Sequence, residues 1–360
     1  MKLTFRWYGD KDPVTLEQIR QIPAMSGIVS AVYDTPVGQV WSTESIAALK
    51  GQAEEKGLAF EVVESVPVHE EIKLGGPDAP QLIANYCEIV KRLGQAGVKV
   101  ICYNFMPVFD WLRSELARPL PDGSHALAYQ EETVLAMDPA RSELSLPGWD
   151  ESYTQGELRS LLERYREVGE ERLWENFAAF LEKVIPAAED AGIRMAIHPD
   201  DPPWGVFGLP RIITGEESYR RMLSINDSKA NGITFCTGSL GANPENDLPK
   251  LAADGWQTAL LDINREAVEA VAQEIRQAGG QAMAVQANVL DKEDLERAAQ
   301  KVQEAWGDCD LLINGAGGNN PRGTTSSEVF SALDLDDPEK TSFFDLDPQG
   351  VRFVFDLNFL

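Results

Sequence analysis

Apolar runs alternate with amphipathic stretches through the first two-thirds of this chain, and this rhythm limits the folds that the chain can form. Strands are predicted where apolar residues are nearly continuous, and helices where they recur every three or four positions. Repeated strand–helix units of this kind indicate a parallel sheet with helices packed on it. The strands predicted before residue 250 cover residues 27–33, 60–65, 98–105, 193–198 and 232–236.

Helix signals fall between these strands. Ser42 or Thr43 can cap a helix that Gly57 ends. Two further helices are predicted over about residues 82–93 and 173–188, where large apolar side chains share one face.

The fold class predicted for residues 1–250 is α/β, a truncated (β/α)8 TIM-type barrel with its first six or so units. No glycine-rich phosphate loop occurs before residue 250, which argues against an open dinucleotide-binding fold there. Functional groups of such barrels lie at the carboxyl ends of the strands. The stretch of about residues 107–171 is rich in Pro and Gly and longer than a plain connection, so we expect a lid-like insertion over a site.

Asn104, His198 and Cys236 stand at predicted strand ends. An imidazole and a thiolate on adjacent strands suit a divalent transition metal such as Mn²⁺, Fe²⁺ or Zn²⁺. A buried Cys is often a small hydrophobic residue, and a His at a strand end is often only hydrogen-bonded. The flanking segments 198–204 and 236–241 are polar, tightly turned loops, which favours a site.

After residue 250 the alternation continues with different residues, and a partial Rossmann-like βαβ segment is predicted over residues 251–360. Asp262 ends its first strand, and Asp291 can cap its second helix. Its predicted strands cover residues 257–262, 282–289 and 310–317.

Two architectures are open for the joined parts. In the first, two separate partial folds expose strand edges, which makes a homo-oligomer a candidate assembly. In the second, the segments around Leu260 and Val285 become the seventh and eighth strands of a hybrid barrel. Complementary cores seldom arise between unrelated halves by chance, which favours separate folds.

The net charge of -26 argues against nucleic acid or an anionic membrane as a partner. A small anionic substrate is compatible with this net charge, because the electrostatic field at the site, and not the total charge, decides whether the substrate binds. No segment is long and apolar enough to span a bilayer and no signal peptide is present, so a cytoplasmic location is expected. Four widely spaced cysteines form no disulfide framework or metal knuckle: Cys87, Cys102, Cys236 and Cys309.

Six segments of the first part are distinctive: residues 5–9 (FRWYG), 12–20, 64–69, 102–111, 198–202 (HPDDP) and 236–241 (CTGSLG). Together they closely resemble the bacterial D-mannonate dehydratase family over about residues 1–250. That family consists of metal-dependent barrel enzymes, which convert D-mannonate to 2-dehydro-3-deoxy-D-gluconate and water in glucuronate catabolism. The resemblance implies that His198 and Cys236 are two of four ligands of a Mn²⁺ or Fe²⁺ ion.

The resemblance also implies D-mannonate as the substrate, with contacts from Trp7, Tyr8, His69 and Asn104. Structural interpretations stand beside these roles. Trp7 and Tyr8 can pack at one end of the barrel, and His69 can cap a loop.

The family pattern stops at about Lys250. In the family a further metal-binding His and Asp come from later strands, and the acid–base residues lie near the last ligand. His198 is the last of the three histidines, so no later histidine can serve as ligand or base. We therefore expect half of the metal site and the catalytic acid–base residues to be missing, which leaves the catalytic residues unknown.

The second part resembles short-chain dehydrogenases/reductases of the D-mannonate oxidoreductase (fructuronate reductase) type. The resemblance is carried by Asp262, Asn288, the turn that begins at Asn314, and residues 355–358 (FDLN). It implies that Asp262, Asn288 and Asn314 are remnants of an NAD site. The first strand with its phosphate-binding turn is replaced, and the sequence ends at Leu360 before a Tyr-x-x-x-Lys pair. NAD is therefore not expected as a working cofactor.

Three functions follow as hypotheses. The favoured one is a mannonate dehydratase, and the alternatives are an NAD-linked D-mannonate oxidoreductase and a non-catalytic remnant that binds a metal or sugar acid weakly. Turnover of D-mannonate would indicate the dehydratase, and reduction with a nicotinamide cofactor would indicate the oxidoreductase. Thermal stabilisation by a ligand without turnover would indicate the non-catalytic remnant.

Overall fold

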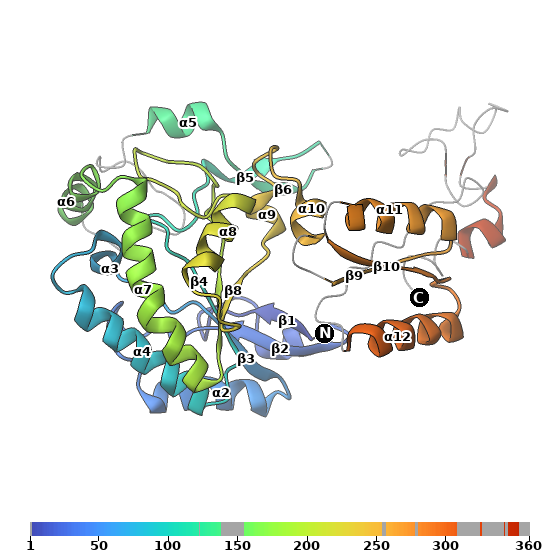
Figure 1. Cartoon of the computed structure of the whole chain (residues 1–360), viewed down its shortest axis with the longest axis horizontal. Coiled ribbons are helices and arrows are strands. Elements are labelled where there is room, and N and C mark those ends of the chain that lie inside the picture. The colour runs from blue at the N-terminus through green and yellow to red at the C-terminus, as the bar shows by residue number, and fades with distance from the viewer. Residues whose placement is uncertain are drawn as a thin grey trace. The chain divides into compact units, whose positions relative to one another are not determined.

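The computed structural model describes residues 2–121, 123–137, 155–253, 257–277, 280–307, 325, 342 and 345–352. The chain divides into two compact units (Figure 1). One unit is Lys2–Leu248, and the other is Pro249–Leu360 together with Met1.

Six parallel strands form the sheet of the first unit, and their order in space follows their order in the chain. A sequential order is the order of a (β/α) barrel, whereas a doubly wound sheet reverses direction at a switch point. The predicted α/β class with a partial barrel is therefore confirmed. The strands are β1 (Leu3–Arg6), β2 (Met25–Ser30), β3 (Ala59–Glu64), β4 (Val100–Tyr103), β7 (Arg194–Ile197) and β8 (Asn231–Ile233).

The helices follow the predicted signals closely. Ser42 is the N-cap of α2, where its hydroxyl accepts a hydrogen bond from the Ser45 backbone at 2.9 Å. Gly57 follows this helix with φ +70°, a conformation that favours glycine. The described helices of the barrel part are α1 (Leu16–Arg20), α2 (Thr43–Glu55), α3 (Glu70–Leu74), α4 (Ala79–Gln95), α7 (Glu170–Ala191), α8 (Glu216–Ile225) and α9 (Thr237–Leu240).

An aromatic cluster fixes α4 and α7, which lie side by side beside the strands (Figure 1). Phe180 of α7 makes an edge-on contact with Tyr86 of α4 at a centroid distance of 5.0 Å. Phe105, which follows β4, packs on Phe177 at 4.7 Å and on Phe180 at 5.8 Å. Because these rings are almost fully buried, the cluster anchors the end of β4 and the loop that follows it.

The insertion contains more structure than the sequence predicts. An antiparallel pair, β5 (Glu115–Pro119) and β6 (His125–Ala128), precedes two helices, α5 (Glu131–Ala136) and α6 (Gln155–Tyr165). The sequence predicts only partial helix here. A separate apolar cluster ties this region to the loop after β7, through residues that include Phe109, Tyr165 and Leu209.

The second unit holds a parallel pair of strands, β9 (Gln257–Asp262) and β10 (Gln281–Gln286). In the described part of the chain these strands pair only with each other, so they form a sheet separate from the six-stranded one and do not complete a hybrid barrel. The predicted third strand, residues 310–317, lies outside the described residues. The described helices of this unit include α10 (Leu248–Ala253), α11 (Arg265–Gln277) and α12 (Lys292–Trp306), and Asp291 caps α12 as predicted.

Among the described helices, none has both the length and the apolar character needed to cross a bilayer.

Candidate functional site

The carboxyl ends of the parallel strands lie at one edge of the sheet and bring distant residues together. His198 directly follows β7, and Cys236 follows β8, the neighbouring strand. These are two of the three strand-end residues that the sequence singles out, and the structure brings them into contact.

His198 and Cys236 form a hydrogen-bonded pair that favours charge separation. The hydrogen bond with His198 lowers the pKa of the Cys236 thiol to about 6, against the effect of its partial burial. Burial works against a charged imidazole, but the hydrogen bonds to Cys236 and to the carbonyl of Pro199 outweigh it and raise the pKa of His198. These shifts favour the protonation state in which a thiolate lies beside a protonated imidazole.

The imidazole of His198 has one nitrogen committed to the backbone. Nδ1 lies 2.7 Å from the carbonyl oxygen of Pro199, and since a carbonyl only accepts, Nδ1 donates. Nε2 is then left to face the thiolate or to bind a metal.

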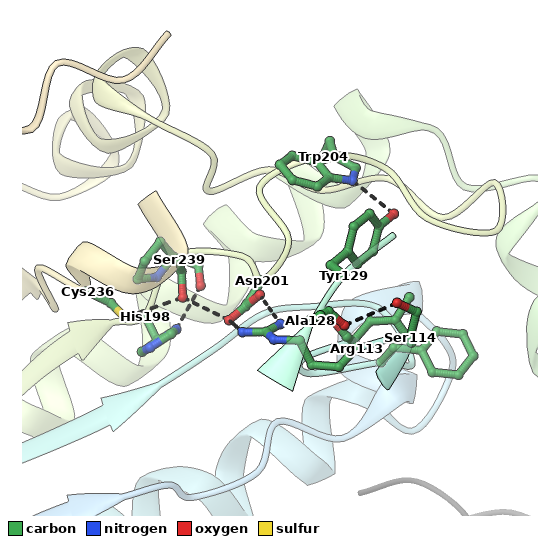
Figure 2. Close-up of polar contacts among 12 residues, drawn as sticks. Arg113, Ser114, Ala128, Tyr129, His198, Asp201, Trp204, Cys236 and Ser239 are labelled. Atoms are coloured by element: carbon green, nitrogen blue, oxygen red, sulfur yellow. Dashed lines mark hydrogen bonds and ion pairs between the residues drawn. The ribbon is translucent and has the colours of Figure 1, made fainter. Parts of the chain in front are cut away.

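A chain of polar side chains extends from Cys236 toward the insertion (Figure 2). The hydroxyl of Ser239 lies 3.3 Å from Cys236 Sγ and donates to Asp201 Oδ2 at 3.1 Å. The guanidinium of Arg113 holds the same carboxylate with two bonds of 2.7 and 3.0 Å. Arg113 stands just before β5, so these contacts connect the thiol with the start of the insertion.

The remaining predicted substrate contacts are placed differently. Trp7 is buried at 4% exposure, and its carbonyl accepts a bond of 2.7 Å from the Ser30 hydroxyl, whereas Tyr8 is 60% exposed. Asn104 accepts from the backbone of Met106 at 3.3 Å and hydrogen-bonds Asp110.

His69 is the N-cap of α3, and its Nδ1 accepts from the Glu71 backbone at 3.1 Å. It lines a pocket with Trp41 and Tyr86, and neither His198 nor Cys236 contributes to that pocket. The capping interpretation of His69 matches its contacts.

The predicted nucleotide residues occupy strand ends in the second unit. Asp262 ends β9 and accepts from the Asn264 backbone at 2.7 Å, and Asn288 accepts from the Leu290 backbone at 3.1 Å. Both side chains thus make local turn contacts. Asn314 lies outside the described residues, as do residues 355–358.

Three functional candidates were missed in the sequence: Arg113, Asp201 and Ser239. Asp201 and Ser239 stand inside the distinctive segments 198–202 and 236–241, so the available signal was their position beside the chosen residues. The described residues contain no group of three or more His, Cys, Asp and Glu side chains arranged to hold a metal. Of the predicted ligand set, these residues contain the pair His198 and Cys236, and their role as metal ligands stays a prediction.

Comparisons with known proteins agree with the division of the chain. The family model of D-mannonate dehydratase matches residues 1–265, and that of short chain dehydrogenase matches residues 248–351. The chain is 56% identical over 269 residues to a mannonate dehydratase from Streptococcus uberis, covering 75% of this chain and 74% of that protein.

Two solved structures are also similar. The mannonate dehydratase of Streptococcus suis is 50% identical, with a TM-score of 0.65, over 71% of this chain and 69% of that chain. A putative D-mannonate oxidoreductase from Haemophilus influenza with bound NAD is 46% identical over 31% of this chain and 39% of that chain, with a TM-score of 0.29.

Proposed function

The chain belongs to the D-mannonate dehydratase family, joined to a segment of short-chain dehydrogenase type, and from this premise we propose that it acts as a metal-dependent hydro-lyase on D-mannonate. The observation that carries the proposal is the His198–Cys236 pair at the ends of two neighbouring strands, inside the matched residues. The products would be 2-dehydro-3-deoxy-D-gluconate and water.

His198 and Cys236 fit a divalent metal by their chemistry. The Nδ1 contact with Pro199 leaves Nε2 available, and the lowered pKa of Cys236 provides a thiolate near neutral pH. Nitrogen and thiolate donors suit Fe²⁺, Mn²⁺ or Zn²⁺, and we propose Mn²⁺ or Fe²⁺. A bound divalent ion would stabilise the negative charge that develops when a proton is removed beside the sugar-acid carboxylate.

Ser239, Asp201 and Arg113 would keep the thiolate in place. Asp201 accepts from both of the other side chains, so the loop after β7, the loop after β8 and the insertion are fixed to one another. A ligating side chain that is already held by hydrogen bonds loses less conformational freedom when it binds a metal.

A second candidate function is metal binding without turnover. It is favoured by the described residues, in which no third His, Cys, Asp or Glu joins the pair. Two protein donors leave the remaining coordination positions to water or to the sugar acid, and binding would be weaker than at a four-ligand site.

The deciding experiment is D-mannonate dehydration by the full chain with added Mn²⁺, measured as 2-keto-3-deoxy acid. We expect product that is lost in His198→Ala and retained in His125→Ala, a matched change in the exposed β6 strand. Mn²⁺ binding without product would favour the second function.

A nicotinamide-dependent reaction is tested in the same preparation. The match to short chain dehydrogenase motivates the test. An absorbance change of NADH with fructuronate, independent of His198, would favour a reductase instead.

A further inference from the structure

A protein of net charge -26 that takes a sugar acid needs a local positive charge beside its site. The basic side chains in the described segments that end or follow β1, β4 and β7 include Arg6, Arg113 and Arg211. Arg113 is occupied by Asp201 through two bonds. Arg211 is buried, donates to the Phe109 carbonyl, and its charged neighbours are all carboxylates, the closest in effect being Asp200. Arg113 is therefore ion-paired, whereas Arg211 is under the influence of several carboxylates without a described ion pair.

Arg6 differs from Arg113 because it has no described ion pair, and from Arg211 because it is half-buried whereas Arg211 is buried. It is the last residue of β1, and among the described residues no carboxylate lies within ion-pair distance of its guanidinium. Its Nη1 nitrogen is buried without a hydrogen-bond partner, as are Nε and Nη1 of Arg211. A buried N–H group of a charged side chain that lacks a partner is costly, so a missing acceptor is expected at this position.

The guanidinium of Arg6 also lies over an aromatic ring. Its central carbon lies 4.8 Å from the centre of the Tyr8 ring, and Tyr8 is exposed. Stacking on an aromatic face leaves the N–H edge of an arginine free to bind a carboxylate with two parallel hydrogen bonds.

Arg6 shares its surroundings with the metal-binding pair. Burial raises the pKa of Cys102 to about 12, and the other charges that act on this thiol are Glu64, Arg6 and Cys236. Glu64 ends β3, pairs in register with Cys102, and also acts on His198. Arg6 therefore belongs to the same strand-end surroundings as His198 and Cys236.

We propose that Arg6 is a substrate-binding residue, which holds the carboxylate of the sugar acid through its free N–H edge while Tyr8 fixes the plane of the guanidinium. The proposal rests on the proposed function for its substrate class. It assigns to β1 a role that complements the donors on β7 and β8.

The test is calorimetric titration of the full chain with D-mannonate, with and without Mn²⁺. D-Mannitol has the same hydroxyl arrangement without the carboxylate and serves as the uncharged probe. We expect the Kd for D-mannonate to rise at least about tenfold in Arg6→Gln, because a charge-assisted, two-bond contact is lost. Arg6→Lys keeps the charge without the planar edge, and an intermediate rise is expected.

The matched control is Arg194→Gln, which removes an exposed arginine at the opposite end of β7 and should leave the Kd unchanged. If Arg6→Gln fails to fold, as judged by circular dichroism, Arg6→Lys decides. The proposal would be overturned by an unchanged Kd for D-mannonate in the folded Arg6 variants, or by an equal rise of that Kd in Arg194→Gln. It would also be overturned if the chain bound D-mannitol as tightly as D-mannonate, or did not bind D-mannonate at all. If D-mannonate binds in an Arg6-dependent way but is not dehydrated, the role of Arg6 is supported and the proposed dehydratase activity is contradicted.

Discussion

Cys236 and Cys102 hold their protons very differently, although both belong to the strand-end surroundings of the site. The hydrogen bond with His198 lowers the pKa of Cys236 to about 6, whereas burial raises that of Cys102 to about 12. At pH 7.5 iodoacetamide should therefore modify Cys236 more than about tenfold faster than Cys102, since the thiolate is the reactive form. The rate at Cys236 should fall as the pH drops through about 6. Peptide mass spectrometry would measure both rates.

His198→Gln provides the control for this labelling. It removes the largest cause of the lowered pKa, so the midpoint of the Cys236 rate should move up toward the usual thiol range. A midpoint that stays near 6 would contradict the assigned cause. Added Mn²⁺ should slow the labelling if Cys236 is a ligand.

The two central site residues could be predicted from the sequence, and their partners could not. His198 and Cys236 stand at the ends of apolar strands, so their positions follow from the fold. The contact of Arg113 with Asp201 joins residues 88 positions apart, and that of Ser239 with Asp201 spans 38. A single sequence contains no periodic signal for such pairs. The predicted substrate roles of Trp7, Tyr8, His69 and Asn104 stay predictions.

At the scale of elements, the insertion is joined to the loop after β7 by the Arg113–Asp201 ion pair, whose side chains are mostly buried. Asp201→Asn should destabilise the barrel unit by about 1–3 kcal/mol, because Arg113 loses a charged, two-bond partner. Urea unfolding followed by circular dichroism would measure the change.

Glu171→Gln is the matched control for this variant. It breaks an equally two-bonded ion pair with Arg221, at 2.6 and 2.8 Å, on the exposed side of α7. A much smaller loss of stability is expected, since exposed ion pairs contribute little. Equal losses in the two variants would show that burial of the Arg113–Asp201 pair has no special effect.

Elements with a strong apolar pattern could be predicted, and weakly patterned ones could not. The strands β2, β3, β4 and β7 and the helices α2, α4 and α7 carry near-continuous or helical apolar spacing. β1 has only four residues, none of them buried, and β5 is almost wholly exposed. Their strand character comes from pairing with a neighbour and leaves little trace in the sequence.

At the scale of the whole molecule, the two units have separate sheets and separate apolar clusters. The described cluster of the second unit is small and centres on Val285, Ala287 and Ala298. Small cores give marginal stability, so scanning calorimetry should show two transitions, with the second unit melting first.

Two core variants assign these transitions. Phe180→Ala removes a fully buried ring of the barrel unit and should lower the upper transition, at a cost of about 3–5 kcal/mol. Val285→Ala should lower only the lower transition. A single transition that both variants shift would mean that the units unfold together.

The overlap of the two family matches at residues 248–265 also bears on how such a chain can be inherited. The stretch contains α10 and β9, so both families accommodate the same residues at the seam. A join within this stretch leaves the strands on either side to pair with strands of their own part, so a chain joined here can keep two separate sheets.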